Sequence, residues 1–371
     1  MPKKESNSVL LIWNAMAATQ VSGGDIYIKK FIEYCPFTFD VLLSEHGLRL
    51  INKKAARHLY VTDNENAAGT IKLSLLYIKR FFRARKIVKT NDSHYDIVLA
   101  SSPFLPDILP ALFKNASHRA VVFFHLIPKR KGHDFRTKLR FFVARTEQKV
   151  SLFIIGRYFD TILAGNIVVK KELEAKFPNK KIVIADAGID TKLMDRYKVT
   201  AKDPNMATFI GRLTTQKGVM DLVRICEKIQ KEKPEFYLDV IGDGQDRHLF
   251  EEAIIARNIK NIHLKGFVTE QEKYESLYRS TFFIFPSYEE GWGIALAEAL
   301  YAGVSVFCYE LPHYESIFGS YPYYVPLGAY DDLAYTILEQ YDQPLKNGQV
   351  LFMRHHDDRA VIDRTVNEMN A

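Results

Sequence analysis

The segment 285–306 constrains most strongly how this chain can fold. It begins at the end of an apolar run that predicts a buried β-strand, and Pro286 with a glycine-rich turn ends that strand. Residues rich in Ala and Leu then predict a helix from about Gly293 to Gly303, where a glycine is typical of a helix end. A second apolar strand follows at 304–307. Strand, loop, helix and strand form one unit of a parallel α/β sheet, and such sheets bind ligands in the loops after their strands.

Two acidic side chains are placed to reach a ligand in this unit. Glu290 lies in the loop, and Glu298 lies on the helix eight residues later. The free N–H groups of a helix start favour phosphate, so acids beside them suit a ligand that carries both hydroxyls and phosphates. Each carboxylate can also have a structural role, because Glu298 could cap a neighbouring loop and Glu290 could face solvent. The two residues alone leave both interpretations open.

The remainder of the chain predicts two similar α/β halves, in which strands alternate with helical stretches. This alternation is typical of parallel sheets that helices cover on both faces. The strands expected in the first half are 9–13, 38–43, 97–100, 120–124 and 161–164. Those expected in the second half are 206–210, 237–241, 261–264, 282–285 and 304–308.

The length of 371 residues suits two domains. We expect an N-terminal domain at 1–190, a C-terminal domain at 191–350, and a C-terminal segment, 351–371, that can cross back to the first domain. Residues 191–204 would be the linker between the domains.

A second ligand motif opens the C-terminal domain. The strand that ends at Gly211 leads into a tight loop and a helix start near Gly218, an arrangement that cradles phosphates. Arg212 offers a planar fork of donors and Lys217 a point charge, and both suit a diphosphate. Alone, this motif would be a weak signal.

Together these segments resemble the retaining GT-B glycosyltransferases of family four, which use nucleotide sugars and carry a Glu-x7-Glu signature. The Gly-Arg-Leu and Lys-Gly pairs of the phosphate motif match the family, and the likeness runs through most of residues 206–308. Ser305 stands where the family has Pro. The matching positions of the signature are Pro286, Ser287, Glu290, Gly291, Trp292 in place of Phe, Gly293, Glu298, Ala299, Gly303 and Val306.

The resemblance implies a GT-B fold, in which two Rossmann-like parallel-sheet domains face a central cleft. It implies that the C-terminal domain binds the nucleotide sugar and the N-terminal domain the acceptor. The diphosphate would contact Arg212 and Lys217. The ribose hydroxyls would contact Glu298, and the sugar hydroxyls would contact Glu290. The implied catalytic residues are Glu290, His125, Arg212 and Lys217. The implied donor-binding residues are Gly23, Gly24, Gly211, Arg212, Lys217, Gly242, Phe267, Val268, Glu290, Gly291, Trp292, Gly293, Ile294 and Glu298.

The N-terminal domain matches the family more loosely. The pair Gly23 and Gly24 resembles the family's glycine-rich loop, where glycines allow close approach to a ligand. His125 resembles a His that contacts the transferred sugar, and the loop Ser101–Asp107 also resembles a family loop. Ala187 and Asn166 depart from the family's usual Asn and Ser. The identity of the donor sugar therefore stays open.

The resemblance implies a retaining, metal-independent hexosyltransferase of glycan or polysaccharide biosynthesis. No cofactor is expected beyond the donor itself, such as a UDP- or GDP-sugar, because the sequence has neither an Asp-x-Asp motif nor a His/Cys ligand cluster. Two alternatives remain: a GT-B-fold nucleotide-sugar epimerase, and a catalytically inactive glycosyltransferase-like subunit.

Positive charge is concentrated in the first half, where residues 1–190 contain 31 Lys and Arg against 17 Asp and Glu. Much of it lies in Lys72–Lys89 and Lys129–Lys149. In the first segment Ile71, Leu75 and later apolar residues recur at helical spacing. A basic amphipathic helix is typical of binding to an anionic membrane surface, and also of an ordinary solvated face. We do not expect nucleic acid as a partner, since no recognised binding module accompanies the charge.

Two further features bear on location. Lys3 and Lys4 precede an apolar run that imitates a signal peptide, but Asn14 interrupts it, and we interpret it as the first strand. The cysteines are far apart and form no CxxC pair, which is typical of a reducing compartment. We expect a cytoplasmic protein that can lie on the cytoplasmic face of a membrane and accept a saccharide or a lipid-linked saccharide.

Overall fold

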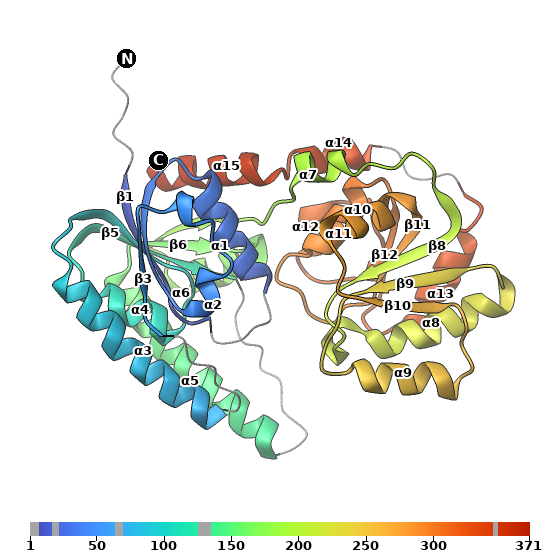
Figure 1. Cartoon of the computed structure of the whole chain (residues 1–371), viewed down its shortest axis with the longest axis horizontal. Helices are drawn as coiled ribbons and strands as arrows, with labels where there is room; N and C mark the ends of the chain where they lie inside the picture. Colours follow the sequence, from blue (N-terminus) through green and yellow to red (C-terminus); the bar gives the residue numbers. More distant parts are fainter. Residues whose placement is uncertain (1–6, 17–21, 64–69, 125–134, 344–347) are drawn as a thin grey trace. The chain divides into compact units, whose positions relative to one another are not determined.

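The computed structural model describes residues 7–16, 22–63, 70–124, 135–343 and 348–371 and divides the chain into two compact units (Figure 1). Unit 1 comprises Met1–Ala187 and Arg359–Ala371, and unit 2 comprises Gly188–Asp358. The C-terminal helix α15 (Asp358–Asn370) therefore belongs almost entirely to unit 1.

Unit 1 is built on a seven-stranded parallel sheet with the order β3-β2-β1-β4-β5-β6-β7. The strands are β1 (Ser8–Trp13), β2 (Thr38–Leu43), β3 (His58–Val61), β4 (Tyr95–Ala100), β5 (Ala116–Phe123), β6 (Thr161–Ala164) and β7 (Lys181–Ile184). The helices between them are α1 (Gly23–Tyr34), α2 (Glu45–Leu48), the short 3-10 helix η1 (Lys53–Ala55), α3 (Thr70–Thr90), α4 (Leu105–Ala111), α5 (Phe135–Tyr158) and α6 (Ile167–Lys176).

Helices cover both faces of this sheet, because successive residues of each strand point to opposite faces. Leu11 of β1 packs in a core with α1 and α15, whereas its neighbour Leu10 packs in a second core with α3, α4 and α5. Both side chains are almost fully buried. The near-continuous apolar runs seen in the sequence are therefore explained by burial on two sides.

Unit 2 repeats the plan on a six-stranded parallel sheet with the order β10-β9-β8-β11-β12-β13. The strands are β8 (Asp203–Ile210), β9 (Tyr237–Ile241), β10 (Ile262–Gly266), β11 (Ser280–Phe285), β12 (Ser305–Tyr309) and β13 (Tyr323–Val325). The remaining elements are α7 (Thr191–Arg196), η2 (Thr215–Lys217), α8 (Val219–Glu232), α9 (Arg247–Ala256), α10 (Glu270–Arg279), α11 (Ile294–Tyr301), α12 (Tyr314–Phe318), α13 (Tyr330–Glu339) and α14 (Gln349–Arg354).

Each sheet has a topological switch point, where the strand order reverses direction. In unit 2 the switch lies between β8 and β11, and in unit 1 between β1 and β4. Open α/β sheets bind their ligands outside the carboxyl ends of the strands at this point. The loops that follow β8 and β11 are the two that carry the sequence motifs of the C-terminal half.

The expected α/β architecture with two Rossmann-like parallel sheets is confirmed. The expected linker at 191–204 is wrong: residues Thr191–Arg196 form α7, and β8 begins at Asp203. The side chain of Asp190 caps α7 by accepting a hydrogen bond from the N–H of Leu193 at 2.9 Å, which explains why a helix starts there. Among the described residues, none of the helices is both long enough and apolar enough to cross a bilayer.

Candidate functional site

The loops after β8 and β11 pack against each other at the switch point of unit 2. Gly218 follows η2 with a φ of +68°, and a Cβ added there would lie 1.9 Å from the carbonyl oxygen of Pro286. The N–H of Tyr288 donates to the carbonyl of Gln216 at 2.8 Å. A left-handed conformation and a backbone contact this close both require glycine. The Lys-Gly pair of the motif is therefore needed to bring the two loops together.

Lys217 and Glu290 form an ion pair across these two loops. The ammonium group of Lys217 contacts Oε1 of Glu290, and both side chains are mostly buried. The same ammonium lies 5.8 Å from the ring centroid of Phe285, within the range of a cation–π contact. The structure thus brings together one cation and one anion that the sequence analysis assigned to the donor.

Arg212 lies in the same loop as Lys217 but is exposed. Within the described part of the chain, no hydrogen bond and no ion pair of its guanidinium is found. The loop is anchored by backbone hydrogen bonds, because the N–H of Gly211 donates to Ile241 and the N–H of Leu213 donates to Asp243 at 3.0 and 3.1 Å. The guanidinium of Arg212 is therefore carried by a fixed backbone, and its positive charge is not neutralised by a neighbouring acid among the described residues.

Gly242 holds the end of β9 against this loop. Its φ is +128°, and a Cβ added there would lie 2.0 Å from the carbonyl oxygen of Gly211. Its N–H donates to Gly266 at the end of β10 at 2.8 Å. The carboxyl ends of β8, β9 and β10 are consequently joined by backbone alone.

The helix α11 begins beside the Lys217–Glu290 pair. Gly293 precedes it in the left-handed region with a φ of +105°, so the N–H groups of the first turn, starting at Ile294, are free of a side-chain cap. At the other end, the N–H groups of Gly303 and Val304 donate to Leu300 and Ala299, which is a Schellman motif. The expected helix from Gly293 to Gly303 is confirmed, with these two glycines flanking it.

Glu298 is 5% exposed and lies on α11 with two hydrogen-bond donors. The ammonium of Lys273 lies 3.0 Å and the hydroxyl of Tyr274 lies 3.1 Å from its Oε1. Burial alone would lower the pKa of Lys273, but the charges of Glu298 and Glu270 outweigh it, and the pKa is raised. The carboxylate of Glu298 is thus fixed in direction by two side chains of α10.

The other predicted donor residues of unit 2 have different degrees of burial. Trp292 is buried, and its ring packs against Phe318 at 5.4 Å between centroids. Phe267 is 83% exposed, and Val268 beside it is half-buried in the turn between β10 and α10. A Cβ added at Gly291 would meet nothing within 4 Å. An exposed Phe267 is free to stack on a flat ligand, whereas Trp292 has a structural position.

In unit 1 the structure places Gly23 and Gly24 in the first turn of α1, not in a loop before it. Ser22 and Asp25 form a capping box that starts the helix at this point. A Cβ added at Gly24 would lie 2.8 Å from the ring of Phe124. His125, the predicted sugar-contacting residue, lies outside the described residues.

Asp107, within the loop expected to be functional, holds the switch point of unit 1 together. Its Oδ1 accepts the N–H groups of Asn14 and Ala15 at 2.6 and 2.8 Å, and its Oδ2 accepts the hydroxyls of Ser101 and Ser102. Burial raises the pKa of Asp107 to about 6, although these donors oppose the shift. Its role in this structure is to tie β1 to the loop after β4.

Three residues of the unit 2 site were not predicted from the sequence. Lys273 and Tyr274 hold Glu298, and no motif signals either, although Thr269 and Glu272 form a capping box that marks the start of α10. Tyr314 is fully buried beside Gly293, and its hydroxyl has no hydrogen-bond partner among the described residues. Burial and then the charge of Glu290 raise its pKa well above the usual value.

The described residues contain no group of three or more His, Cys, Asp or Glu side chains that could hold a metal ion. The groups that can contact a ligand in this site are therefore the cations Lys217 and Arg212, the carboxylates of Glu290 and Glu298, and the N–H groups at the start of α11. Together they can bind an anion and several hydroxyl groups in one place.

The chain is similar in sequence to several known proteins. Residues 190–347 match the family model of the glycosyl transferases group 1. A 2-deoxystreptamine N-acetyl-D-glucosaminyltransferase of Niallia circulans is 29% identical over 119 residues, which are 32% of this chain and 31% of that protein. An uncharacterized glycosyltransferase of Methanocaldococcus jannaschii is 28% identical over 196 residues, or 46% of this chain and 47% of that protein. The chain thus matches less than half the length of either relative.

The similarity of fold extends over the whole chain. The structure of Anabaena HepE in complex with UDP and glucose aligns with a TM-score of 0.72 at 13% identity, over 98% of this chain and 99% of that one. At this identity the likeness shows the fold alone. Residues 190–347 are therefore similar to the glycosyl transferases group 1, and the two units of the chain have the GT-B fold.

Proposed function

We propose that this protein is a retaining, metal-independent glycosyltransferase that moves a sugar from a nucleotide sugar to a saccharide or lipid-linked saccharide in glycan biosynthesis. The observation that carries the proposal is the Lys217–Glu290 pair at the switch point of unit 2, beside the start of α11. A nucleotide sugar carries a diphosphate next to sugar hydroxyls, and this pair offers a cation next to an anion. The family match and the UDP and glucose bound by the similar HepE support the same ligand class.

The residues of unit 2 divide the donor between them. Arg212 and Lys217, with the free N–H groups of α11, neutralise the charge that develops on the diphosphate as it leaves. Electrostatic stabilisation of this kind contributes about 3 kcal/mol per donor group. Glu290 accepts hydrogen bonds from sugar hydroxyls, and Glu298 accepts them from the ribose. Phe267, Val268 and Gly266 form the turn that faces the base.

The reaction requires one bond to break and one to form at the anomeric carbon. The bond from this carbon to the phosphate oxygen breaks, and its electron pair stays on the diphosphate. The hydroxyl oxygen of the acceptor attacks the same face of an oxocarbenium-like sugar, which retains the configuration, and its proton moves to the released phosphate oxygen. We assign the acceptor to unit 1. Gly23 and Gly24 stay predicted donor-binding residues, and His125 stays the predicted contact of the transferred sugar.

We propose further that the acceptor is presented at an anionic membrane on its cytoplasmic face. The basic segment predicted as amphipathic forms α3, and its apolar residues Leu75, Ile78 and Phe82 are 57%, 54% and 59% exposed. Apolar and basic side chains exposed on one helix are typical of a helix that lies in a membrane interface. Not all of its charge is available, because Arg80 is fully buried and pairs with Asp63 at 2.5 Å.

The proposal is tested by assaying product formation from UDP- and GDP-sugars, with and without saccharide and polyprenyl-linked acceptors. Arg212→Ala and Lys217→Ala are expected to lower the turnover of a folded enzyme by roughly 10²–10³, the scale of one lost transition-state donor. Lys228→Ala serves as the control. It removes a positive charge near the end of α8, away from the loop that carries Lys217, and should leave turnover unchanged. Conversion of a nucleotide sugar without acceptor would indicate an epimerase, and donor binding without turnover on any acceptor would indicate an inactive subunit.

A further inference from the structure

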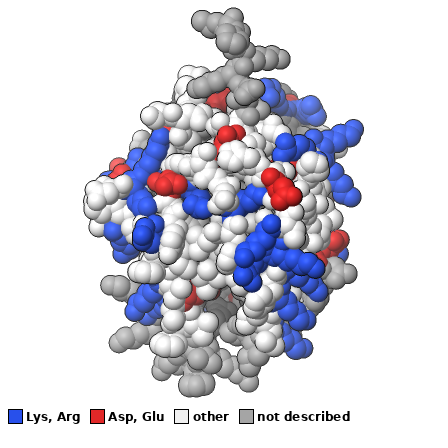
Figure 2. Space-filling model, turned by 90° about the vertical axis from the view of Figure 1, so that its left-hand side faces the viewer, with Lys and Arg blue, Asp and Glu red and all other residues white. Residues whose placement is uncertain are grey.

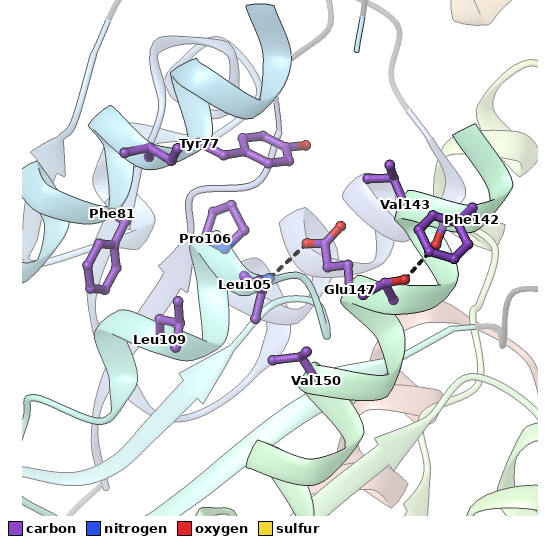
Figure 3. A pocket seen from close by; sticks show the side chains of 11 residues that line it. Tyr77, Phe81, Leu105, Pro106, Leu109, Phe142, Val143, Glu147 and Val150 are labelled. Carbon is purple, nitrogen blue, oxygen red and sulfur yellow. Dashed lines mark hydrogen bonds between the residues drawn. The ribbon is translucent and has the colours of Figure 1, made fainter. Parts of the chain in front are cut away.

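A cavity of about 460 Å³ lies between α3, α4 and α5 of unit 1. Figure 3 shows side chains of the three helices pointing into it, among them Phe81 of α3, Pro106 and Leu109 of α4, and Phe142 and Val150 of α5. Its volume is within the range of roughly 300–1,000 Å³ typical of small-molecule sites. The predicted donor and sugar-binding residues are not among its lining.

The lining offers very little to a polar ligand, because its polar side chains are already engaged inside the protein. The hydroxyl of Tyr77 donates to the carbonyl of Ala15 at 3.0 Å, and that of Thr146 donates to Phe142 at 2.9 Å. Glu147 accepts the N–H of Leu105 at 3.2 Å, as the dashed line in Figure 3 marks. A water molecule in such a site needs two to four polar partners, so this cavity favours a hydrocarbon occupant.

The surface around the cavity is apolar and basic at the same time. On α5, Phe142 and Phe153 are 69% and 74% exposed, and on α3 Phe82 is exposed as well. The sequence of α3 contains no Asp or Glu, and its residues Lys72 and Lys86 are exposed. Figure 2 shows that Lys and Arg greatly outnumber Asp and Glu on the face of unit 1 that it presents.

This charge limits which occupant can cover the cavity. A second copy of the chain would bring two acid-free helices α3 together, and like charges repel. An amphiphile with an anionic head group satisfies both features, because its chain can fill the apolar cavity while its head group lies among the lysines. The occupant that fits the described residues is therefore a lipid with an anionic head group.

We propose that the cavity between α3, α4 and α5 binds the hydrocarbon chain of a lipid-linked acceptor, and that the basic side chains of α3 hold its phosphate head group. The inference rests on the proposed function in one respect only, namely that the lipid is an acceptor. Binding of the chain itself depends on the cavity and can be measured without any transfer reaction.

The test is calorimetric titration of the full chain with dodecyl phosphate below its critical micelle concentration, and with inorganic phosphate. We expect saturable binding of dodecyl phosphate with a negative heat-capacity change, the mark of apolar burial, and at least ten-fold weaker binding of inorganic phosphate. In the double variant Val143→Trp, Val150→Trp, which fills the cavity, affinity for dodecyl phosphate should fall at least ten-fold. The double variant Val61→Trp, Val350→Trp makes the same substitutions at exposed positions outside the cavity and should bind as the wild type does.

A second measurement needs no variant. A dodecyl phosphate with a photoreactive diazirine at the end of its chain should cross-link to peptides of α3, α4 and α5. Equal affinity in wild type and filled variant, no binding to either, or cross-links confined to other elements would each overturn the proposal. So would sedimentation that shows a wild-type dimer and a monomeric filled variant, because a second copy would then cover this face.

Titration with UDP and GDP in the same samples separates the two proposals. A chain that binds dodecyl phosphate in the cavity but binds no nucleotide keeps the lipid site and loses the proposed function. If the chain binds nucleotide and transfers sugar, and the cavity-filling substitutions do not change its binding of dodecyl phosphate, the proposed function stands and the lipid site is refuted.

Discussion

The ammonium group of Lys273 lies 3.0 Å from Oε1 of Glu298 and joins α10 to α11. Both side chains are largely buried, at 16% and 7% exposure. Removing one partner of such a pair leaves an uncompensated charge, which costs roughly 3–5 kcal/mol.

Lys273→Met should therefore lower the free energy of unfolding by about 3 kcal/mol and weaken the binding of nucleoside diphosphate. Adding Glu298→Gln to this variant should recover part of the lost stability, because the unpaired charge is removed, but should not recover the binding. Urea unfolding and calorimetry measure the two effects. Lys228→Met, at an exposed pair with Asp331, is the control and should leave the free energy of unfolding nearly unchanged. If the losses of unfolding free energy in the two single variants simply add in the double variant, Lys273 and Glu298 are not energetically coupled.

Gly218→Ala should destabilise unit 2 and separate the two ligand loops. An Ala at a φ of +68° costs about 1–2 kcal/mol, and its Cβ would also collide with the carbonyl of Pro286. We expect a loss of more than about 2 kcal/mol of unfolding free energy in urea. The matched control is Gly291→Ala, whose Cβ would meet nothing within 4 Å and whose effect on stability should stay within about 0.5 kcal/mol. Similar losses in both variants would show that the close approach is unimportant.

The imidazole of His313 should make the stability of unit 2 depend on pH in mildly acidic solution. Burial lowers its pKa from 6.5 to about 4, and its Nε2 has no partner among the described residues. The unfolded chain therefore binds the proton more readily between these two pH values, and unfolding free energy falls as pH drops from 6.5 toward 4. The loss amounts to about 3 kcal/mol.

His313→Asn removes this contribution, so the difference in stability between pH 7 and pH 4.5 should be smaller in the variant than in the wild type. Chemical unfolding at the two pH values measures it. His248→Asn, at an exposed ring, controls for loss of a histidine. Identical pH dependence in wild type and His313→Asn would contradict the account.

Most of the strands that the sequence predicted are buried; the edge strand β10 is the exception. All ten expected strands are present, whereas β3, β7 and β13 were not predicted. Each of these three lies at an edge of its sheet. An edge strand is short and half-exposed, so it lacks the apolar run that identifies a central strand. Tyr323–Val325, for example, has only one buried residue.

The site shows the same limit. The positions of Lys217, Glu290 and Gly293 could be predicted because each follows the end of a strand or precedes a helix. The contact between Lys273 and Glu298 joins residues that are 25 apart in the chain, and no periodicity relates them. Likewise, the sequence did not show that Gly23 and Gly24 would lie in the first turn of α1. The helix starts at the capping box of Ser22 and Asp25, and the exact first residue of a helix cannot be predicted to within one or two positions.

Exposed lysines of α3 should hold the protein on anionic vesicles. Each basic residue near such a surface contributes about 1 kcal/mol, so reversing Lys72, Lys79 and Lys86 to Glu should weaken binding by at least about 100-fold. Arg83 is left in place because its guanidinium donates to the carbonyl of Thr62 at 3.1 Å.

Co-sedimentation with anionic and neutral liposomes at about 50 mM salt measures the effect, since higher salt screens exposed charge. The variant with Lys53, Lys171 and Lys176 reversed to Glu carries the same change of charge elsewhere on unit 1 and should still bind. A wild type that ignores anionic vesicles would refute the membrane proposal and favour a soluble acceptor.

Calorimetric titration of nucleoside diphosphate into two variants distinguishes the proposed roles of Glu298 and Glu290. Glu298→Ala should weaken binding by at least about ten-fold, because it loses hydrogen bonds to the ribose worth roughly 1.5–3 kcal/mol. Glu290→Ala should bind the nucleotide nearly as the wild type does and lose sugar transfer, because we propose that its carboxylate contacts the sugar and not the nucleotide. Equal losses of nucleotide affinity in the two variants, or none in Glu298→Ala, would contradict the account.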